Sequence, residues 1–273
     1  SPWNLVPPSL TPKKKFIFKN QVTKEFDVII SCGRKSVIPS IILKKNSSKK
    51  VVNIHIQNPK VSLDNFDIIV APDHDSIEGS NVLISKGAIH YLTSDEINKA
   101  KVYLEDKIEK QKEVITLILG GPTKYYNYDN ESMIQIFSKI NKQIVEKNMQ
   151  LIVIPSNRTP EKTIQFAKEY FNKNRLILDK VDKQAYLSSL ALAKYIIVTC
   201  DSSSMISEAA LTGKPVYVAM IPAMRNDKRF QKFRNLLESM NIIRKLENNL
   251  ETWSYEKLDE TNRIAKQIKD KLL

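Results

Sequence analysis

One stretch of the sequence, residues 195–218, constrains the fold more than any other. An apolar run typical of a buried strand leads into a polar turn and a short helical segment, and after Gly213 and Pro215 a second apolar run follows. Hydroxyls and a carboxylate gather in the turn and at the helix start. In α/β proteins ligands bind at the carboxyl ends of strands, and a helix N-terminus offers free N–H groups to phosphate. The stretch therefore predicts a phosphate-bearing ligand, with a nucleotide as the first candidate.

Strand and helix patterns alternate along most of the remaining chain. Apolar runs predict strands at 26–32, 51–57, 66–71, 81–85, 88–92, 114–119, 151–155 and 175–179. Helical spacing or composition predicts helices at 36–45, 95–111, 130–147, 160–172, 183–193, 226–240 and 254–273. Alternation of this kind predicts parallel sheets with right-handed crossovers.

These elements form two series that join near residues 108–113. We expect an α/β fold of two Rossmann-like domains with parallel sheets, residues 1–110 and 111–273, and a ligand cleft between them. The last helix can pack back on the N-terminal domain. The first series is short, since no strand with its loop precedes Phe26, so we expect this domain to lack its first βα unit.

The chain is basic, with 43 Lys and Arg against 30 Asp and Glu, a formal charge of +13. Such an excess can indicate nucleic acid or an anionic membrane. However, most basic residues are Lys, and Asn and Ile are abundant, which points to an A+T-rich coding sequence. We expect no nucleic-acid partner. Peripheral contact with an anionic membrane stays open through the clusters Lys13–Lys15 and 44–50.

The sequence predicts a cytoplasmic protein. No run of 18 apolar residues exists to span a membrane, and the start of the chain lacks the pattern of a secretory signal. Two cysteines, Cys32 and Cys200, give neither a disulfide framework nor metal spacing. We interpret both as small buried residues at strand ends.

Two turns after predicted strands are candidates for nucleotide or phosphate binding. Gly120 and Gly121 can bring a backbone close to a ligand and expose N–H groups, and a tight turn needing positive φ is the alternative. Arg158 places a guanidinium, which suits phosphate, at another strand end. The neighbouring Thr159-Pro160 pair reads as a helix cap followed by the first helical residue.

The turn of the 195–218 stretch supplies the remaining nucleotide candidates. Ser202, Ser203 and Ser204 offer a cap and anion donors. Glu208 lies one helical turn further on, where a carboxylate can accept two ribose hydroxyls. The alternative for Glu208 is a favourable partner for the helix dipole.

A second group belongs to the first domain. Gly33 and Arg34 follow a strand and can contact an anion, and Asp73 opens a polar turn after another strand. His74 and Asp75 are candidates for acid/base catalysis. We expect no metal here, because no second cluster of His or Cys accompanies them. His55 and His90 lie in apolar runs and are interpreted as core residues.

Several of these segments, in order, resemble the mitochondrial fission ELM1-like family, also found in bacteria. They are residues 31–34, 66–75, 81–83, 86–90, 119–122, 155–160, 198–202 and 207–216. The resemblance covers about residues 26–240 and implies a metal-independent GT-B-type glycosyltransferase fold, with Glu208 on the ribose. Family members usually begin with a further strand and loop, and they tend to carry a basic residue where Asn157 stands.

The resemblance leaves more than one function open. We expect a glycosyltransferase that binds a nucleotide-sugar in its C-terminal domain as substrate, without a cofactor. The alternative is a non-catalytic adaptor on the same scaffold, the role the resemblance implies for plant members in organelle fission. An epimerase or hydrolase of sugar nucleotides is a third possibility. For a transferase we expect Gly33, Arg34 and Asp73 on the acceptor side, although the acceptor itself is not revealed.

Overall fold

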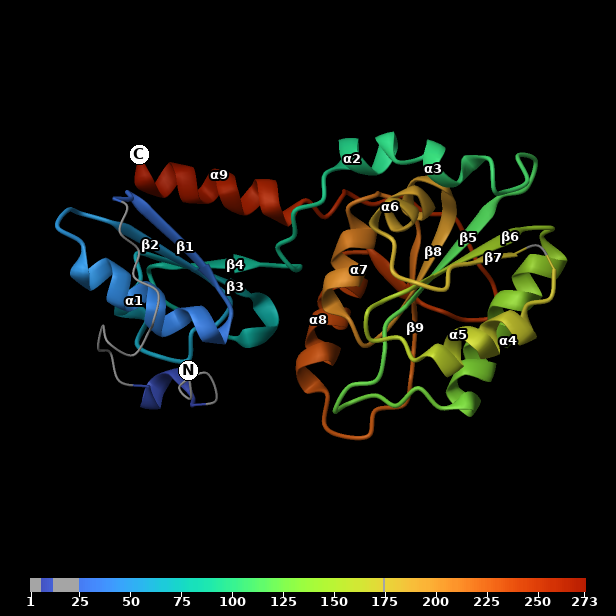
Figure 1. Ribbon diagram of the computed structural model, residues 1–273, viewed down its shortest axis with the longest axis horizontal. Coiled ribbons are helices and arrows are strands. Elements are labelled where there is room, and N and C mark those ends of the chain that lie inside the picture. Colours follow the sequence, from blue (N-terminus) through green and yellow to red (C-terminus); the bar gives the residue numbers. More distant parts are fainter. Residues whose placement is uncertain (1–5, 12–24, 174) are drawn as a thin grey trace. The chain divides into compact units, whose positions relative to one another are not determined.

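The computed structural model describes residues 6–11, 25–173 and 175–273, and it divides into two compact units. The N-terminal unit comprises Ser1–Lys86 with Glu260–Leu273, and the C-terminal unit comprises Gly87–Asp259. Each unit is α/β with one parallel sheet, as the alternation of patterns predicts (Figure 1).

The N-terminal unit contains a sheet of four parallel strands in the order β1-β2-β3-β4. These strands are Val28–Cys32, Val52–Ile56, Ile68–Pro72 and Val82–Ser85. Helix α1 (Val37–Asn46) and helix α9 (Glu260–Leu272) lie on opposite sides of this sheet (Figure 1). Short 3-10 turns lie at Pro8–Leu10, Arg34–Ser36, Leu63–Asn65 and Asp73–Asp75.

Strand β1 forms one edge of this sheet. Among the described strands it pairs with β2 alone, and its apolar Val28 and Ile30 are 45% and 69% exposed. Cys32 at its end is also exposed, so the expectation that Cys32 is buried is wrong. The reason is its position at a sheet edge, where a strand end has neighbours on one side only. Cys200 is buried as predicted.

The last helix belongs to the N-terminal unit through polar contacts. Glu260, at the start of α9, is buried and accepts a hydrogen bond of 2.6 Å from the backbone N–H of Lys86. Arg263 binds the same carboxylate and donates to the carbonyl of Ile84 at 2.7 Å. These contacts attach α9 to strand β4.

The C-terminal unit contains a sheet of six parallel strands in the order β10-β9-β8-β5-β6-β7. In chain order, from β5 to β10, its strands are Val114–Leu119, Gln150–Pro155, Arg175–Ile177, Ala193–Thr199, Val216–Ala219 and Ile243–Lys245. Counted within the unit, this is the 3-2-1-4-5-6 order of a doubly wound fold. The strand order reverses between β5 and β8, which is where such folds bind ligands, at the carboxyl ends.

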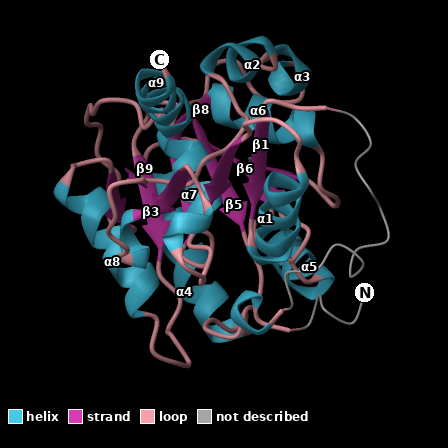
Figure 2. Ribbon diagram, turned by 90° about the vertical axis from the view of Figure 1, so that its left-hand side faces the viewer, coloured by secondary structure: helices cyan, strands magenta, loops and turns pink. Residues whose placement is uncertain are grey.

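Helices flank the strands (Figure 2). Those of the C-terminal unit are α2 to α8: Ser94–Lys99, Val102–Glu105, Asn130–Glu146, Glu161–Tyr170, Lys183–Leu192, Ser203–Ala210 and Lys228–Ser239. Helix α4 shows why the sequence folds this way locally. Asp129 caps it by accepting from Ser132 N at 2.8 Å, and the residues that recur every three or four positions, such as Phe137 and Ile140, are fully buried.

The boundary between the two units differs from the domain boundary that the sequence predicts after residue 110. Residues 87–110 belong with the C-terminal unit, because α2 and α3 pack on α6. Leu104 N donates to Ser188 Oγ at 3.1 Å, and Tyr103 OH donates to Asp182 at 2.7 Å. Side-chain contacts between segments about eighty residues apart decide this assignment, and a local pattern does not contain them.

Some local predictions were wrong. Residues 88–92 are not a strand, and the helix expected at 95–111 is instead two short helices followed by turns. A capping box between Thr93 and Glu96 starts the first helix at Ser94. Strand β10 was not predicted, because its three residues give too short a pattern.

Among the described residues, no helix is long and apolar enough to cross a membrane. The cluster Lys13–Lys15 lies outside the described residues. In the other basic cluster, Lys44 pairs with Asp67 at 2.6 Å and Lys49 with Asp27 at 2.8 Å. Neighbouring carboxylates therefore offset part of its charge.

Candidate functional site

The carboxyl ends of β5, β6 and β8 meet around one buried carboxylate, that of Asp201. Its Oδ2 accepts from the backbone N–H of Gly121 at 3.1 Å and from the guanidinium of Arg158 at 2.8 Å. Its Oδ1 accepts from the hydroxyl of Tyr128 at 2.5 Å. Asp201 thereby joins the turns after three strands at the point where the strand order reverses.

The two glycines after β5 are required by the protein's own packing. A Cβ on Gly120 would lie 2.1 Å from Asp201 Oδ2, and one on Gly121 would lie 2.1 Å from the carbonyl oxygen of Arg158. Gly120 N donates to Thr199 Oγ1 at 2.8 Å, and Gly121 N donates to Asp201. The expectation that these N–H groups are exposed is therefore wrong, because polar groups of the β8 end already accept from both.

Arg158 is held at the edge of this cluster. Its guanidinium also donates to the carbonyl of Gly121 at 3.0 Å, yet the side chain keeps 41% of its surface exposed. A guanidinium has five N–H donors, so the two bonds to Asp201 and Gly121 leave others. Arg158 can therefore meet an external anion while it stays paired.

The hydroxyl of Thr159 does not cap the following helix as expected. It donates to the carbonyls of Leu119 and Gly120 and accepts from Ser156 N at 2.8 Å. Helix α5 begins at Glu161 after Pro160, so proline is not its first residue. Thr159 instead ties the turn after β6 to the end of β5.

Ser202 caps helix α7, as the sequence predicts. Its hydroxyl accepts from Met205 N at 3.4 Å. Ser203 and Ser204 are the first two helical residues, half-buried and exposed respectively. The first N–H groups of a helix have no intrahelical acceptor, so this end can receive an anion.

Glu208 is half-buried one turn further along α7. Its carboxylate accepts from the hydroxyl of Tyr186 on α6 at 2.6 Å. Burial raises the pKa of Glu208 and outweighs this hydrogen bond and the nearby His90, both of which lower it. His90 thus contributes to the surroundings of Glu208 and is only half-buried, contrary to the core position expected for it.

A second buried ionic cluster lies at the same strand ends. Asp227 accepts from Tyr126 OH at 2.5 Å and from Arg234 at 3.0 Å. Burial raises the pKa of Asp227, but these two bonds, the charge of Arg234 and a hydrogen bond from Gln231 together outweigh it and hold that pKa below its usual value. The cluster ties the loop after β5 to helix α8, and a backbone bridge between Tyr126 and Ala223 adds the loop after β9.

The acceptor-side candidates belong to the N-terminal unit. Gly33, with φ of +78°, and the exposed Arg34 follow β1, while the half-buried Asp73, His74 and Asp75 form a 3-10 turn after β3. These strands flank β2, so the two groups lie at the carboxyl edge of one sheet. No group of three or more His, Cys, Asp or Glu able to hold a metal ion occurs in the described parts of the chain.

Sequence reasoning gave no role to Asp201, Tyr128 or the cluster around Asp227. Asp201 could have been found, because it directly precedes the cap of α7 and follows a buried strand. Tyr128 carried no signal, since its partners Thr199 and Asp201 are far away in the sequence. Asp227 and Arg234 lie close in the sequence, but Tyr126, which joins them, is about a hundred residues away. His55 is a core residue as expected, fully buried with Nδ1 2.8 Å from Ser31 Oγ.

The two sheets and their strand order define a fold of the GT-B glycosyltransferase type. A UDP-GlcNAc 2-epimerase from Neisseria meningitidis, bound to UDP-GlcNAc, matches with a TM-score of 0.55 and 13% identity, covering 90% of this chain and 75% of that one. The UDP-GlcNAc 2-epimerase of Methanocaldococcus jannaschii matches with a TM-score of 0.51 and 15% identity, covering 89% and 77%. Identities this low show the fold alone.

The chain belongs to the family described as Mitochondrial fission ELM1, whose model matches residues 1–272. An uncharacterized protein of Rickettsia prowazekii is 27% identical over 282 residues, covering 89% of this chain and 79% of that protein. The mitochondrial fission protein ELM1 of Arabidopsis thaliana is 25% identical over 274 residues. That match covers 90% of this chain and 64% of the plant protein.

Proposed function

We propose that the C-terminal unit binds a nucleotide-sugar and that the protein transfers the sugar as a metal-independent GT-B glycosyltransferase. The observation that carries the proposal is Glu208, half-buried in α7 and oriented by Tyr186 beside the strand-order reversal. A carboxylate held there can accept both ribose hydroxyls. The fold of UDP-GlcNAc 2-epimerases, one of them solved with UDP-GlcNAc, supports a nucleotide-sugar as the ligand class.

In this proposal the diphosphate meets the start of α7 at Ser202, Ser203 and Ser204. The free donors of Arg158 add positive charge. Gly120 and Gly121 act indirectly, by holding Asp201 and Arg158 in place. Asp201 is then a positioning residue for Arg158.

The transfer step needs a base and a stabilised leaving group. An acceptor hydroxyl oxygen forms a bond to the anomeric carbon of the sugar, while the bond from that carbon to the diphosphate oxygen breaks. The nucleoside diphosphate leaves with the electron pair, stabilised by Arg158 and the α7 N-terminus. His74 or Asp75 takes the hydroxyl proton, and Gly33, Arg34 and Asp73 bind the acceptor.

Thermal unfolding with a panel of UDP-, GDP-, CMP- and ADP-sugars tests nucleotide binding, because a ligand that binds only the native state raises Tm. We expect at least one to raise Tm. Glu208→Gln keeps an acceptor for Tyr186 but loses the charge, and should weaken binding about ten- to a hundredfold. The matched control is Glu169→Gln on an exposed face of α5. No shift with any sugar nucleotide, or equal affinity in both variants, would rule out this site.

One observation favours a second candidate, a non-catalytic binding protein on this scaffold. Both glycine N–H groups and part of Arg158 are already engaged by Asp201 and Thr199, so fewer donors face a ligand than the sequence indicates. A sugar nucleotide that binds without turnover over a range of acceptors would favour this candidate. Release of free nucleoside diphosphate that depends on an acceptor would favour the transferase.

A further inference from the structure

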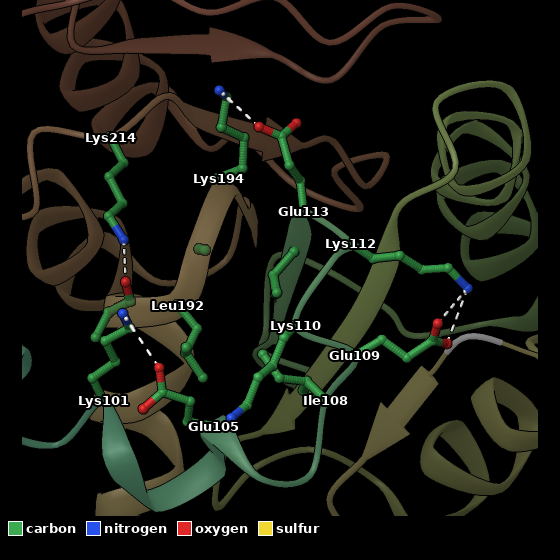
Figure 3. A pocket seen from close by; sticks show the side chains of 13 residues that line it. Lys101, Glu105, Ile108, Glu109, Lys110, Lys112, Glu113, Leu192, Lys194 and Lys214 are labelled. Atoms are coloured by element: carbon green, nitrogen blue, oxygen red, sulfur yellow. Dashed lines mark hydrogen bonds and ion pairs between the residues drawn. The ribbon is translucent and has the colours of Figure 1, made fainter.

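A second polar site lies on the six-stranded sheet of the C-terminal unit, at the strand ends opposite to the candidate nucleotide site. A pocket of about 430 Å³ opens at the amino ends of β5 and β8, whereas the candidate nucleotide site lies at their carboxyl ends (Figure 3). Ile108 and Leu192 contribute to an apolar wall. Five lysines line the pocket: Lys101, Lys110, Lys112, Lys194 and Lys214.

Three of these lysines are paired with three glutamates that also line the pocket. The ion pairs are Lys101–Glu105 at 3.4 Å, Lys112–Glu109 at 2.9 Å and Lys194–Glu113 at 3.0 Å, drawn as dashed lines in Figure 3. Within the described parts of the chain, neither Lys110 nor Lys214 has a carboxylate partner. With every lysine protonated, the pocket lining therefore carries two uncompensated positive charges.

Lys214 is held in place by main-chain oxygens. Its ammonium donates to the carbonyls of Leu190 at 2.9 Å and Ala191 at 2.5 Å, at the end of helix α6. An ammonium group has three hydrogens, so one donor remains. Burial and the nearby charge of Lys101 lower the pKa of Lys214 to about 8. An anion between these two lysines would relieve their repulsion.

We propose that this pocket binds a small organic dianion of the phosphate monoester class, held by Lys214, Lys101 and Lys110. A phosphate monoester carries close to two negative charges and three acceptor oxygens, which match the charge of the pocket and the remaining donor of Lys214. The apolar wall accommodates the carbon part of the ligand. The volume falls within the usual range for small-molecule sites.

Binding should take up protons near pH 8. An anion beside Lys214 favours its charged form and raises its pKa, so the fraction that is neutral at pH 8 becomes protonated. The charged side chains that line the pocket around it are Lys101, Glu105, Glu109, Lys110, Lys112, Glu113 and Lys194. A site made of permanently charged groups would not exchange protons in this way.

Calorimetric titration of the whole chain with phenyl phosphate at pH 8, in two buffers of different ionisation heat, tests the proposal. We expect binding with uptake of about half a proton, since a group with pKa near 8 is half neutral there. Lys110→Gln and Lys214→Gln should each weaken binding about three- to tenfold. The control Lys168→Gln alters an ion pair with the exposed Asp179 elsewhere in the unit and should leave binding unchanged.

Three outcomes would overturn the proposal: no binding of phenyl phosphate, equal affinity in Lys110→Gln and the control, or loss of binding in Arg158→Met. The last would place the probe at the carboxyl ends of the strands instead. Lys214→Gln removes a contact to α6 and can unfold the unit. If this variant is unfolded, the result for Lys110→Gln decides the test. Stabilisation by sugar nucleotides should persist in Lys110→Gln, which separates this test from that of the proposed function.

Discussion

The guanidinium of Arg158 lies 2.8 Å from the carboxylate of Asp201, whose side chain is fully buried. The same carboxylate accepts from the turn after β5, so one acidic side chain fixes the ends of three strands relative to one another. A rigid arrangement of this kind is what a binding site at a strand-order reversal needs.

Replacing Asp201 with Asn should destabilise the C-terminal unit by about 1–3 kcal/mol, because buried donors from Tyr128 and Gly121 lose a charged acceptor. Urea unfolding measures this change in the free energy of unfolding. The control Asp179→Asn removes a carboxylate that is 62% exposed and paired with Lys168, and should cost less than about 0.5 kcal/mol. Equal costs in the two variants would mean that Asp201 does not hold the strand ends.

Gly121→Ala should destabilise the protein by about 1–3 kcal/mol or more, because its Cβ would meet the carbonyl oxygen of Arg158, a backbone atom that cannot turn away. Gly79→Ala is the control. There a Cβ meets the side chains of Leu63, Val82 and Asn81 at 3.1 to 3.2 Å, and side chains can adjust. Thermal unfolding compares the two, and a Tm for Gly121→Ala as high as that of the control would contradict the packing argument.

Tyr126→Phe should destabilise the C-terminal unit by about 1–2 kcal/mol, because the buried Asp227 and Arg234 lose the phenol between them. Tyr103→Phe removes the same kind of bond, from a partly exposed Tyr to Asp182. Water can replace that bond, so Tyr103→Phe should lower the free energy of unfolding by less than Tyr126→Phe. Chemical unfolding of both variants measures the difference, and a larger loss in Tyr103→Phe would refute the role of burial.

His55 should make the N-terminal unit acid-sensitive. Burial lowers the pKa of His55 to about 4, whereas the unfolded chain keeps the ordinary value of 6.5. Between these two pKa values only the unfolded state binds the proton. The free energy of unfolding therefore has its full value above pH 6.5 and falls as the pH drops toward 4. Between pH 7 and pH 5 we expect a loss of about 1–2 kcal/mol.

The free energy of unfolding followed across this pH range measures that loss. His55→Gln keeps a polar partner for Ser31 but does not titrate, so its stability should vary less from pH 7 to 5. A pH dependence as steep in His55→Gln as in the parent chain would assign the effect to other groups.

The local structure of the nucleotide candidates could be predicted in part, and the reasons differ between residues. The capping role of Ser202 follows from the residue type that directly precedes a helical pattern, so the sequence contains it. The glycine pair follows β5 as expected, but its N–H groups are not exposed. Their acceptors, Thr199 and Asp201, lie about eighty residues further along the chain.

Local patterns in the sequence by themselves determined most strands, most helices and the parallel α/β class, because apolar periodicity and capping act over a few residues. Only the tertiary structure decided that residues 87–110 belong with the C-terminal unit, that Cys32 is exposed at a sheet edge and that Asp201 joins Arg158 to Gly121. Each of these depends on side chains from distant segments meeting at strand ends or sheet edges. The order in which the strands pair decides which of these side chains come into contact. A short segment of neighbouring residues does not contain that order.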